Sequence, residues 1–365
     1  MDFIHRYSDS INNSRVVIIG PYPPPLGGIS VHIERVMHKL QQQNNQVFHF
    51  YNDRLYKFRW LRFLPFKLVT YLLYFLYFFF WLLYKYPAYV VYHTMYSKLA
   101  LVELGIINCV QLIYGFKVIV VDHNARHIYT RGRIWKYIFN YYAQLVHVIP
   151  IGDVTYKIYK AGGIQLHDYS IESPFLPPNV HAEKSILATY PQELVSFLQQ
   201  YTPIIGMNAS RIVLWQHKDL YGIDQAIEML NIMRNTYPQI GMVIAIAQIG
   251  DEYHFHKILK QIQMYDLIDH IFILSGNREL WPLLKMVDVF VRPTCADTFG
   301  ISVAESLWLG TPAIASNVCT RPEGTILYQQ GDVDDLVQKI DMALKEKGYG
   351  AIDQQRDHMH TQQTG

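Results

Sequence analysis

Short apolar runs alternate with longer amphipathic stretches through the first half of the chain. An apolar run of four or five residues between turn residues is typical of a strand buried on both faces of a parallel sheet. Five such strands are predicted, at residues 16–19, 47–50, 88–92, 117–121 and 145–149. Helical periodicity lies between most of them, over residues 30–43, 98–114 and 133–144. Ser30 is the predicted N-cap of the first helix. This alternation predicts a doubly wound parallel sheet.

The second half of the chain repeats the pattern. Its strands are predicted at residues 203–207, 242–247, 270–274, 287–291 and 313–315. Its helices are predicted at residues 223–235, 253–264, 278–285, 301–309 and 336–344. With 365 residues the chain exceeds the usual size of one hydrophobic core, so we expect two domains. The fold class is therefore α/β, with two Rossmann-like, doubly wound domains. Their expected bounds are 1–180 and 203–347, with a connector at 181–202 and a polar tail at 348–365.

The segment 292–312, RPTCADTFGISVAESLWLGTP, carries the densest group of candidate functional residues. Asp297 lies in a loop after a predicted strand, and Glu305 follows eight residues later in the first turns of a predicted helix. Phe299, Gly300 and Ile301 form the start of that helix. Free backbone N–H groups and the positive end of the helix dipole favour a bound anion there. An anionic ligand with hydroxyl groups, such as a sugar nucleotide, fits this arrangement.

This segment resembles the E-x7-E signature of retaining GT-B glycosyltransferases of family 4, with Asp297 in place of the first glutamate. The sequence GTPAI at 310–314 is similar to a further part of the same pattern. The resemblance implies two domains that face a cleft and a nucleotide-diphosphate sugar as the donor. It implies that Glu305 binds the ribose hydroxyls and that Asp297 contacts the donor sugar. It also implies that the backbone around Gly300 neutralises the leaving diphosphate.

A glycine-containing loop follows the first predicted strand. Gly27 and Gly28 allow the backbone to approach a phosphate closely, just before a helix N-terminus. The loop is not G-x-G-x-x-G, which argues against a dinucleotide site. It resembles the loop that covers the donor diphosphate and the acceptor in the same family. His123, after another predicted strand, matches a histidine that the family places near the donor sugar, although a histidine at a strand end is also often structural.

Further donor-binding residues follow from the resemblance in the second half. Arg211 is similar to the family arginine that contacts the donor phosphates. The lysine that usually follows is absent from its place, and Lys218 is the candidate substitute. Gly276 and Asn277 resemble a turn that offers backbone groups to the nucleotide base. The alternative interpretation is that these residues are ordinary surface charges or turn residues that bind no ligand.

We expect no metal site and no cofactor besides the nucleotide-diphosphate sugar, which is a substrate. The acids of DVDD at 332–335 superficially match a D-x-D metal motif, but they fit better as the first turn of a helix. The three cysteines share no metal-ligand spacing and are expected to be reduced thiols in a cytoplasmic protein. The first residues show no apolar signal-peptide core.

One segment is both basic and strongly aromatic. No acidic residue lies between 54 and 102, and residues 68–84, LVTYLLYFLYFFFWLLY, carry no charge. As a helix these seventeen residues reach about 25 Å, less than the ~30 Å hydrocarbon core of a bilayer. We favour insertion of segment 54–84 into the plane of an anionic membrane surface, with a buried core helix and a spanning helix as the alternatives.

The sequence therefore predicts a glycosyltransferase at the inner face of the plasma membrane. It would move a sugar from a nucleotide-diphosphate donor to a lipid-linked or saccharide acceptor in surface polysaccharide synthesis, with the anomeric configuration retained. The net charge of +2 gives no reason to expect nucleic acid as a partner. Two alternatives remain. One is a sugar-nucleotide epimerase with the same fold, and the other is a non-catalytic partner subunit.

Overall fold

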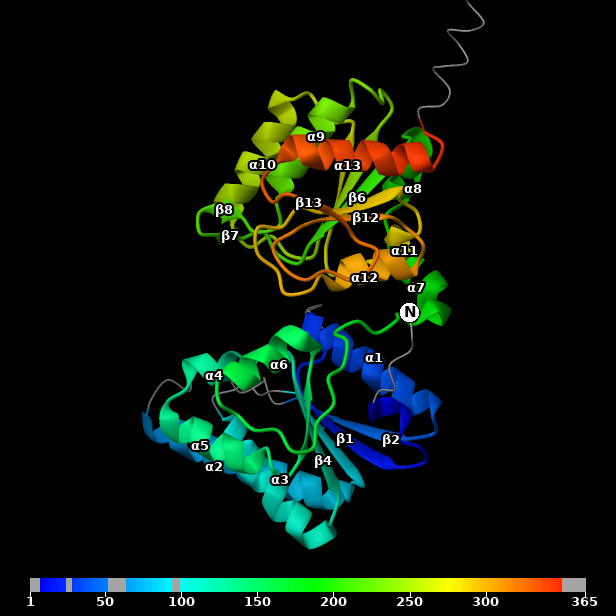
Figure 1. Cartoon of the computed structure of the whole chain (residues 1–365). Helices are drawn as coiled ribbons and strands as arrows, with labels where there is room; N and C mark the ends of the chain where they lie inside the picture. The colour runs from blue at the N-terminus through cyan, green and yellow to red at the C-terminus, as the bar shows by residue number, and fades with distance from the viewer. Residues whose placement is uncertain (1–6, 24–27, 52–63, 94–98, 350–365) are drawn as a thin grey trace, which may run out of the picture. The chain divides into compact units, whose positions relative to one another are not determined.

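The computed structural model describes residues 7–23, 28–51, 64–93 and 99–349, and these residues form two compact units. The division falls between Leu176 and Pro177. Each unit is an α/β domain built on a parallel sheet (Figure 1). The segment 181–202, expected as a connector, forms helices that belong to the second unit.

The N-terminal unit has a five-stranded parallel sheet in the order β2-β1-β3-β4-β5. Its strands are β1 (Arg15–Ile19), β2 (Gln46–Phe50), β3 (Tyr89–Tyr92), β4 (Lys117–Asp122) and β5 (His147–Pro150). Its helices are η1 (Tyr7–Asp9), α1 (Gly28–Gln42), α2 (Leu64–Lys85), α3 (Ala100–Tyr114), α4 (Arg126–Thr130), α5 (Arg133–Tyr142) and α6 (Gly152–Ala161). The prediction that Ser30 caps the first helix is wrong, because α1 already begins at Gly28 and Ser30 is buried inside it.

The two faces of this sheet are covered by different helices. On one face, α2, α3, α5 and α6 share a core with the strands, centred on Phe78, Ile107, Phe139 and Tyr159. On the other face, α1 packs through Ile33, Val36 and Leu40. The strands are buried on both sides, which explains their continuous apolar runs.

Helix α2 has one buried side and one exposed side. One side of it is core, since Phe78 and Leu82 are fully buried and the Tyr74 hydroxyl donates a hydrogen bond of 2.8 Å to Glu103 of α3. The other side is exposed. Its apolar residues are Val69, Leu72, Leu73, Leu76, Tyr77, Phe80 and Tyr84. Among the described helices, none combines the length and the apolar character that crossing a membrane requires.

The C-terminal unit has a six-stranded parallel sheet in the order β10-β9-β6-β11-β12-β13. Its strands are β6 (Ile204–Ala209), β9 (Gly241–Ile246), β10 (Ile271–Ser275), β11 (Val289–Arg292), β12 (Ala313–Ser316) and β13 (Ile326–Tyr328), beside a small antiparallel pair of β7 (Leu214–Trp215) and β8 (Lys218–Asp219). Its helices are η4 (Val180–Ala182), α7 (Glu183–Leu187), α8 (Gln192–Gln200), α9 (Ile223–Met233), α10 (Glu252–Met264), α11 (Trp281–Leu284), α12 (Ile301–Trp308) and α13 (Val333–Glu346).

Helices again cover both faces of this second sheet. The main core is shared by α9, α10 and α13, and the opposite face is covered by α8, α11 and α12 (Figure 1). Within this unit the strands run in the order three, two, one, four, five, six. This order has a reversal between β6 and β11, where ligands of open α/β sheets usually bind beyond the carboxyl ends of the strands.

Candidate functional site

A polar cluster lies at this reversal point of the C-terminal sheet. Asn208 is the penultimate residue of β6 and Arg292 is the last residue of β11. The Arg292 Nη1 donates a hydrogen bond of 3.1 Å to the Asn208 Oδ1. The Arg292 guanidinium also lies over the ring of Tyr221, 5.2 Å from its centroid. The two strands that flank the reversal are therefore joined by a half-buried cation.

Asp297 is held between two arginines in this cluster. Its Oδ2 accepts hydrogen bonds from Arg292 Nε at 3.0 Å and from Arg321 Nη1 at 2.8 Å, and its Oδ1 accepts one from the backbone N–H of Thr298. Burial acts to raise the pKa of Asp297, but the two guanidinium groups and the Thr298 N–H outweigh it and lower the pKa to about 2. Asp297 is therefore a carboxylate at neutral pH.

Arg321 connects the cluster to the end of β12. Its side chain is almost fully buried, and it donates to the carbonyl of Ser316 at 3.0 Å and to the Ser316 Oγ at 3.1 Å. These bonds tie Asp297 to the end of β12. Sequence reasoning missed Arg321, because it lies 24 residues beyond Asp297 in a loop without a motif. It also assigned no role to Arg292, although this residue opens the motif segment.

Gly300 and Glu305 lie beside the cluster at the start of α12. Gly300 has a φ of 88°, and a Cβ at this position would lie 2.7 Å from the Arg321 Nη1, so a side chain is excluded by conformation and by space. Phe299 precedes it and Ile301 opens the helix, whose first turn leaves backbone N–H groups free for a ligand. Glu305, one turn further, is 5% exposed. The structure thus brings Asp297, Phe299, Gly300 and Ile301 together around Arg321.

The other predicted donor-binding residues of this unit lie at the same edge of the sheet. Arg211 follows β6 and packs over Gly250, and Lys218 is an exposed residue of β8. Within the described residues, no contact joins either side chain to Asp297. Gly276, with a φ of 104°, and Asn277 follow β10, two strands away from β6.

In the N-terminal unit, the predicted residues lie at the carboxyl ends of the strands. Gly27 is outside the described residues, and Gly28 is an exposed residue at the start of α1. His123 follows β4, and its Nε2 lies 3.1 Å from the Nδ1 of His93. Burial lowers the pKa of His123 to about 4, although the nearby charge of Asp122 opposes this shift. His123 is therefore neutral at physiological pH.

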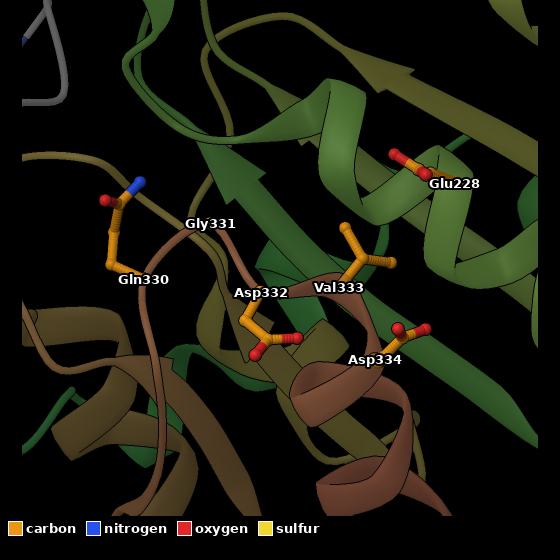
Figure 2. A pocket seen from close by; sticks show the side chains of 6 residues that line it. All are labelled: Glu228, Gln330, Gly331, Asp332, Val333 and Asp334. Atoms are coloured by element: carbon orange, nitrogen blue, oxygen red, sulfur yellow. The ribbon is translucent and has the colours of Figure 1, made fainter.

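A separate hollow of about 620 Å³ lies on the surface of the C-terminal unit, lined by acidic side chains. Figure 2 shows Glu228 of α9 on one side and Asp332 and Asp334 at the start of α13 on the other. The Asp332 Oδ1 accepts a hydrogen bond of 3.0 Å from the backbone N–H of Asp335. Asp332 is thus the N-cap of α13, which agrees with the helix-start interpretation of DVDD. The hollow shares no residue with the arginine–aspartate cluster.

Comparison with known proteins gives similarities of sequence and of fold. Residues 215–362 match the family model "Glycosyl transferases group 1". The chain is 30% identical over 117 residues to a glycogen synthase of Mycobacterium tuberculosis, which is 30% of this chain and 26% of that protein. It is 28% identical over 97 residues to the O-antigen biosynthesis glycosyltransferase WclY of Escherichia coli, which is 27% of this chain and 25% of that protein. The chain spans about a quarter of the length of these curated relatives.

Solved structures resemble the chain over nearly its whole length. The structural match to HepE of Anabaena in complex with UDP-glucose covers 92% of this chain and 91% of the HepE chain. The TM-score of this match is 0.57 and the sequence identity is 13%. The match to a glycosyltransferase of Rickettsia africae covers 92% of this chain and 89% of the Rickettsia chain, with a TM-score of 0.60 and 13% identity. The chain therefore has the two-domain Rossmann-like fold of these glycosyltransferase structures. The family match and the relatives support the glycosyltransferase family.

Proposed function

We propose that the protein is a glycosyltransferase that takes a sugar from a nucleotide-diphosphate donor. The observation that carries this proposal is the cluster of Arg292, Asp297 and Arg321 beside the N-terminus of α12. Its two guanidinium groups and one carboxylate leave a net charge of +1. A net positive cluster, a helix N-terminus and free N–H groups favour the diphosphate that leaves in glycosyl transfer. UDP-glucose bound to HepE, a structure of the same fold, supports this class of donor.

The cluster and the other predicted site residues have distinct roles in this proposal. Glu305 binds the ribose hydroxyls of the nucleotide. Arg292 supplies positive charge where the family's usual lysine is absent, together with Arg211 and Lys218. Asp297 orients both arginines, and its Oδ1 retains a lone pair for a hydroxyl of the donor sugar. The resemblance implies that His123 of the N-terminal unit serves the donor sugar, and this role stays a prediction. The anomeric configuration is retained in this scheme, as the resemblance to family 4 implies.

The acceptor in this proposal is a lipid-linked saccharide used for surface polysaccharide. The match to an O-antigen biosynthesis glycosyltransferase supports this acceptor class. A sugar-nucleotide epimerase with the same fold would have no use for an exposed apolar helix. A non-catalytic partner subunit is favoured by the missing lysine and by Asp297 in place of glutamate. These alternatives differ in what happens to the donor.

Thermal denaturation with a panel of nucleotide sugars tests the proposed donor class. A ligand at 100 times its Kd stabilises the folded state by about 2.7 kcal/mol. We expect one nucleotide sugar to raise the Tm and to be slowly hydrolysed to the nucleoside diphosphate without an acceptor. Conversion of the donor into a second intact nucleotide sugar would identify the epimerase. Stabilisation without any turnover, even when acceptor lipids are present, would identify the partner subunit.

We also propose that the N-terminal unit binds the inner face of the plasma membrane. The exposed apolar residues of α2 form one stripe, at spacings of three and four residues along the helix. A second stripe on α5 consists of Ile134, Tyr137, Ile138 and Tyr141, and all four are exposed. Both helices share the core on one face of the sheet, and an exposed apolar surface of this kind is typical of an interaction site.

The charge around these stripes favours an anionic bilayer as the partner. No acidic residue occurs between residues 54 and 102 or between residues 123 and 152. Arg131, Arg133 and Lys136 lie at or just before the start of α5. Each basic residue near an anionic membrane contributes about 1 kcal/mol, and apolar side chains add the energy of burial in the interface. The basic residues of segment 54–63, which lie outside the described residues, belong to the same acid-free window.

Replacing Leu73, Tyr77 and Phe80 by glutamate should release the protein from anionic vesicles. All three side chains are about 60% exposed, so the change leaves the core intact. The matched control replaces three exposed apolar residues of the C-terminal unit, Met264, Ile268 and Met342, by glutamate. Vesicle flotation measures the bound fraction, which we expect to fall at least tenfold for the first variant and to stay unchanged for the control. Equal binding of both variants would exclude α2 from the membrane contact.

A further inference from the structure

Three histidines converge at the carboxyl edge of the N-terminal sheet. His32 lies in the first turns of α1, which follows β1, and His93 and His123 directly follow β3 and β4. The strands β1, β3 and β4 are neighbours in the sheet, and the order of strands reverses between β1 and β3. This reversal is where ligands of open α/β sheets bind. The three imidazoles therefore lie at a ligand-binding position of the fold.

The geometry of the three rings is that of a ligand set. Each histidine offers a ring nitrogen, and the three nitrogens lie within 4.8 Å of one another. The His93 Nδ1 and the His123 Nε2 are 3.1 Å apart. A tetrahedral metal with Zn–N bonds of 2.0–2.1 Å places its ligand nitrogens about 3.4 Å apart. Small side-chain movements are enough to bring the three nitrogens to that spacing.

We propose that His32, His93 and His123 bind a divalent transition-metal ion, with Zn²⁺ as the best fit. Imidazole nitrogen is a preferred ligand of Zn²⁺, and three protein ligands with an open fourth position are typical of sites that bind a water or a substrate oxygen. His123 is half-buried, while His32 and His93 are buried, so the group is reached by solvent through His123. A water, a hydroxyl or a phosphate oxygen completes the coordination.

Two further observations distinguish this site from a packed group of structural histidines. The Nε2 of His93 is buried and has no hydrogen-bond partner among the described residues, so protein contacts do not account for this ring nitrogen. The Nδ1 of His32 lies 3.4 Å from the carbonyl oxygen of Pro174. A metal-bound histidine usually donates its second ring N–H to such a carbonyl, which orients the ring.

The sequence predicted no metal site because these histidines are 61 and 30 residues apart and share no motif. Only the parallel arrangement of three strands brings them together. The proposal concerns the N-terminal unit alone and does not depend on the proposed transferase activity.

A Co²⁺ titration of the full-length protein, stripped of metal with a chelator, tests the site without any nucleotide. We expect one Co²⁺ per chain, with the intense visible absorption of a four- or five-coordinate site, and its displacement by Zn²⁺. Removal of groups that only support a ligand costs 10–100-fold in metal affinity, so His93→Gln and His123→Gln should each cost at least about 100-fold. His38→Gln is the control, because His38 is an exposed residue on the same helix as His32.

Wild-type protein that binds no Co²⁺, or variants that keep the wild-type affinity, would overturn the proposal. A second measurement does not depend on the folding of the variants. X-ray absorption of the Zn²⁺-loaded wild type counts the imidazole ligands directly. Three imidazoles per zinc are expected, and fewer than three would contradict the site.

Discussion

Replacing Arg321 by methionine should destabilise the C-terminal unit by about 3 kcal/mol and abolish donor binding. Breaking a buried ion pair by removing one partner costs 3–5 kcal/mol, and the lower end applies because Arg292 still pairs with Asp297. The Ser316 carbonyl and hydroxyl also lose a buried donor. Donor binding is lost because the cluster then has no net positive charge and the start of α12 loses its support.

Hydrogen exchange of the amides in β11 and β12, resolved by mass spectrometry, measures this effect in the unit concerned. A loss of 3 kcal/mol corresponds to exchange that is roughly 100-fold faster. The matched control is Arg234→Met, because the Arg234 side chain donates a hydrogen bond to the carbonyl of Asp266 at the surface. If the Arg321 variant exchanged no faster than the Arg234 variant, Arg321 would not be the anchor of the cluster.

Replacing Glu305 by glutamine should weaken binding of the nucleoside diphosphate about 10–100-fold and leave the fold intact. A carboxylate that accepts hydrogen bonds from ribose hydroxyls contributes about 1.5–3 kcal/mol, and an amide of the same shape contributes less. Isothermal titration calorimetry measures the change in Kd. Glu228→Gln is the control, because Glu228 is a glutamate of the acidic hollow in Figure 2. If the Glu228 variant lost affinity for the nucleoside diphosphate and the Glu305 variant did not, the nucleotide would bind in that hollow and not at Glu305.

The strands and the motif of the C-terminal unit could be predicted because their signals are local. Val289, Phe290 and Val291 of the predicted run are buried and lie in β11. Gly300 precedes α12 as its N-cap, because few residues other than glycine adopt a φ of 88°. The short strand β13 carries no comparable run and was missed. The boundary of the first helix differed, because α1 begins at Gly28 and not after Ser30.

The partners of the site residues could not be predicted from the sequence. Arg321 reaches Asp297 only because β12 lies beside β11, and Arg292 reaches Asn208 only because β11 lies beside β6. Such contacts depend on strand order, which the sequence pattern does not encode. Helix α2 illustrates the same limit. Its sequence is aromatic and aliphatic almost throughout, so it did not indicate which side of the helix is buried and which is exposed. The roles of Arg211, Lys218, Gly276 and Asn277 in donor binding stay predictions.

Transfer of a labelled sugar tests the central claim most directly. Purified protein is incubated with a nucleotide sugar labelled in the sugar and with lipid-linked saccharides extracted from membranes. We expect the label to appear in the lipid fraction with release of one nucleoside diphosphate per sugar, and we expect Glu305→Gln and Arg321→Met to lose this transfer. Label that stays in an intact nucleotide sugar, with no product in the lipid fraction for any donor of the panel, would contradict the account.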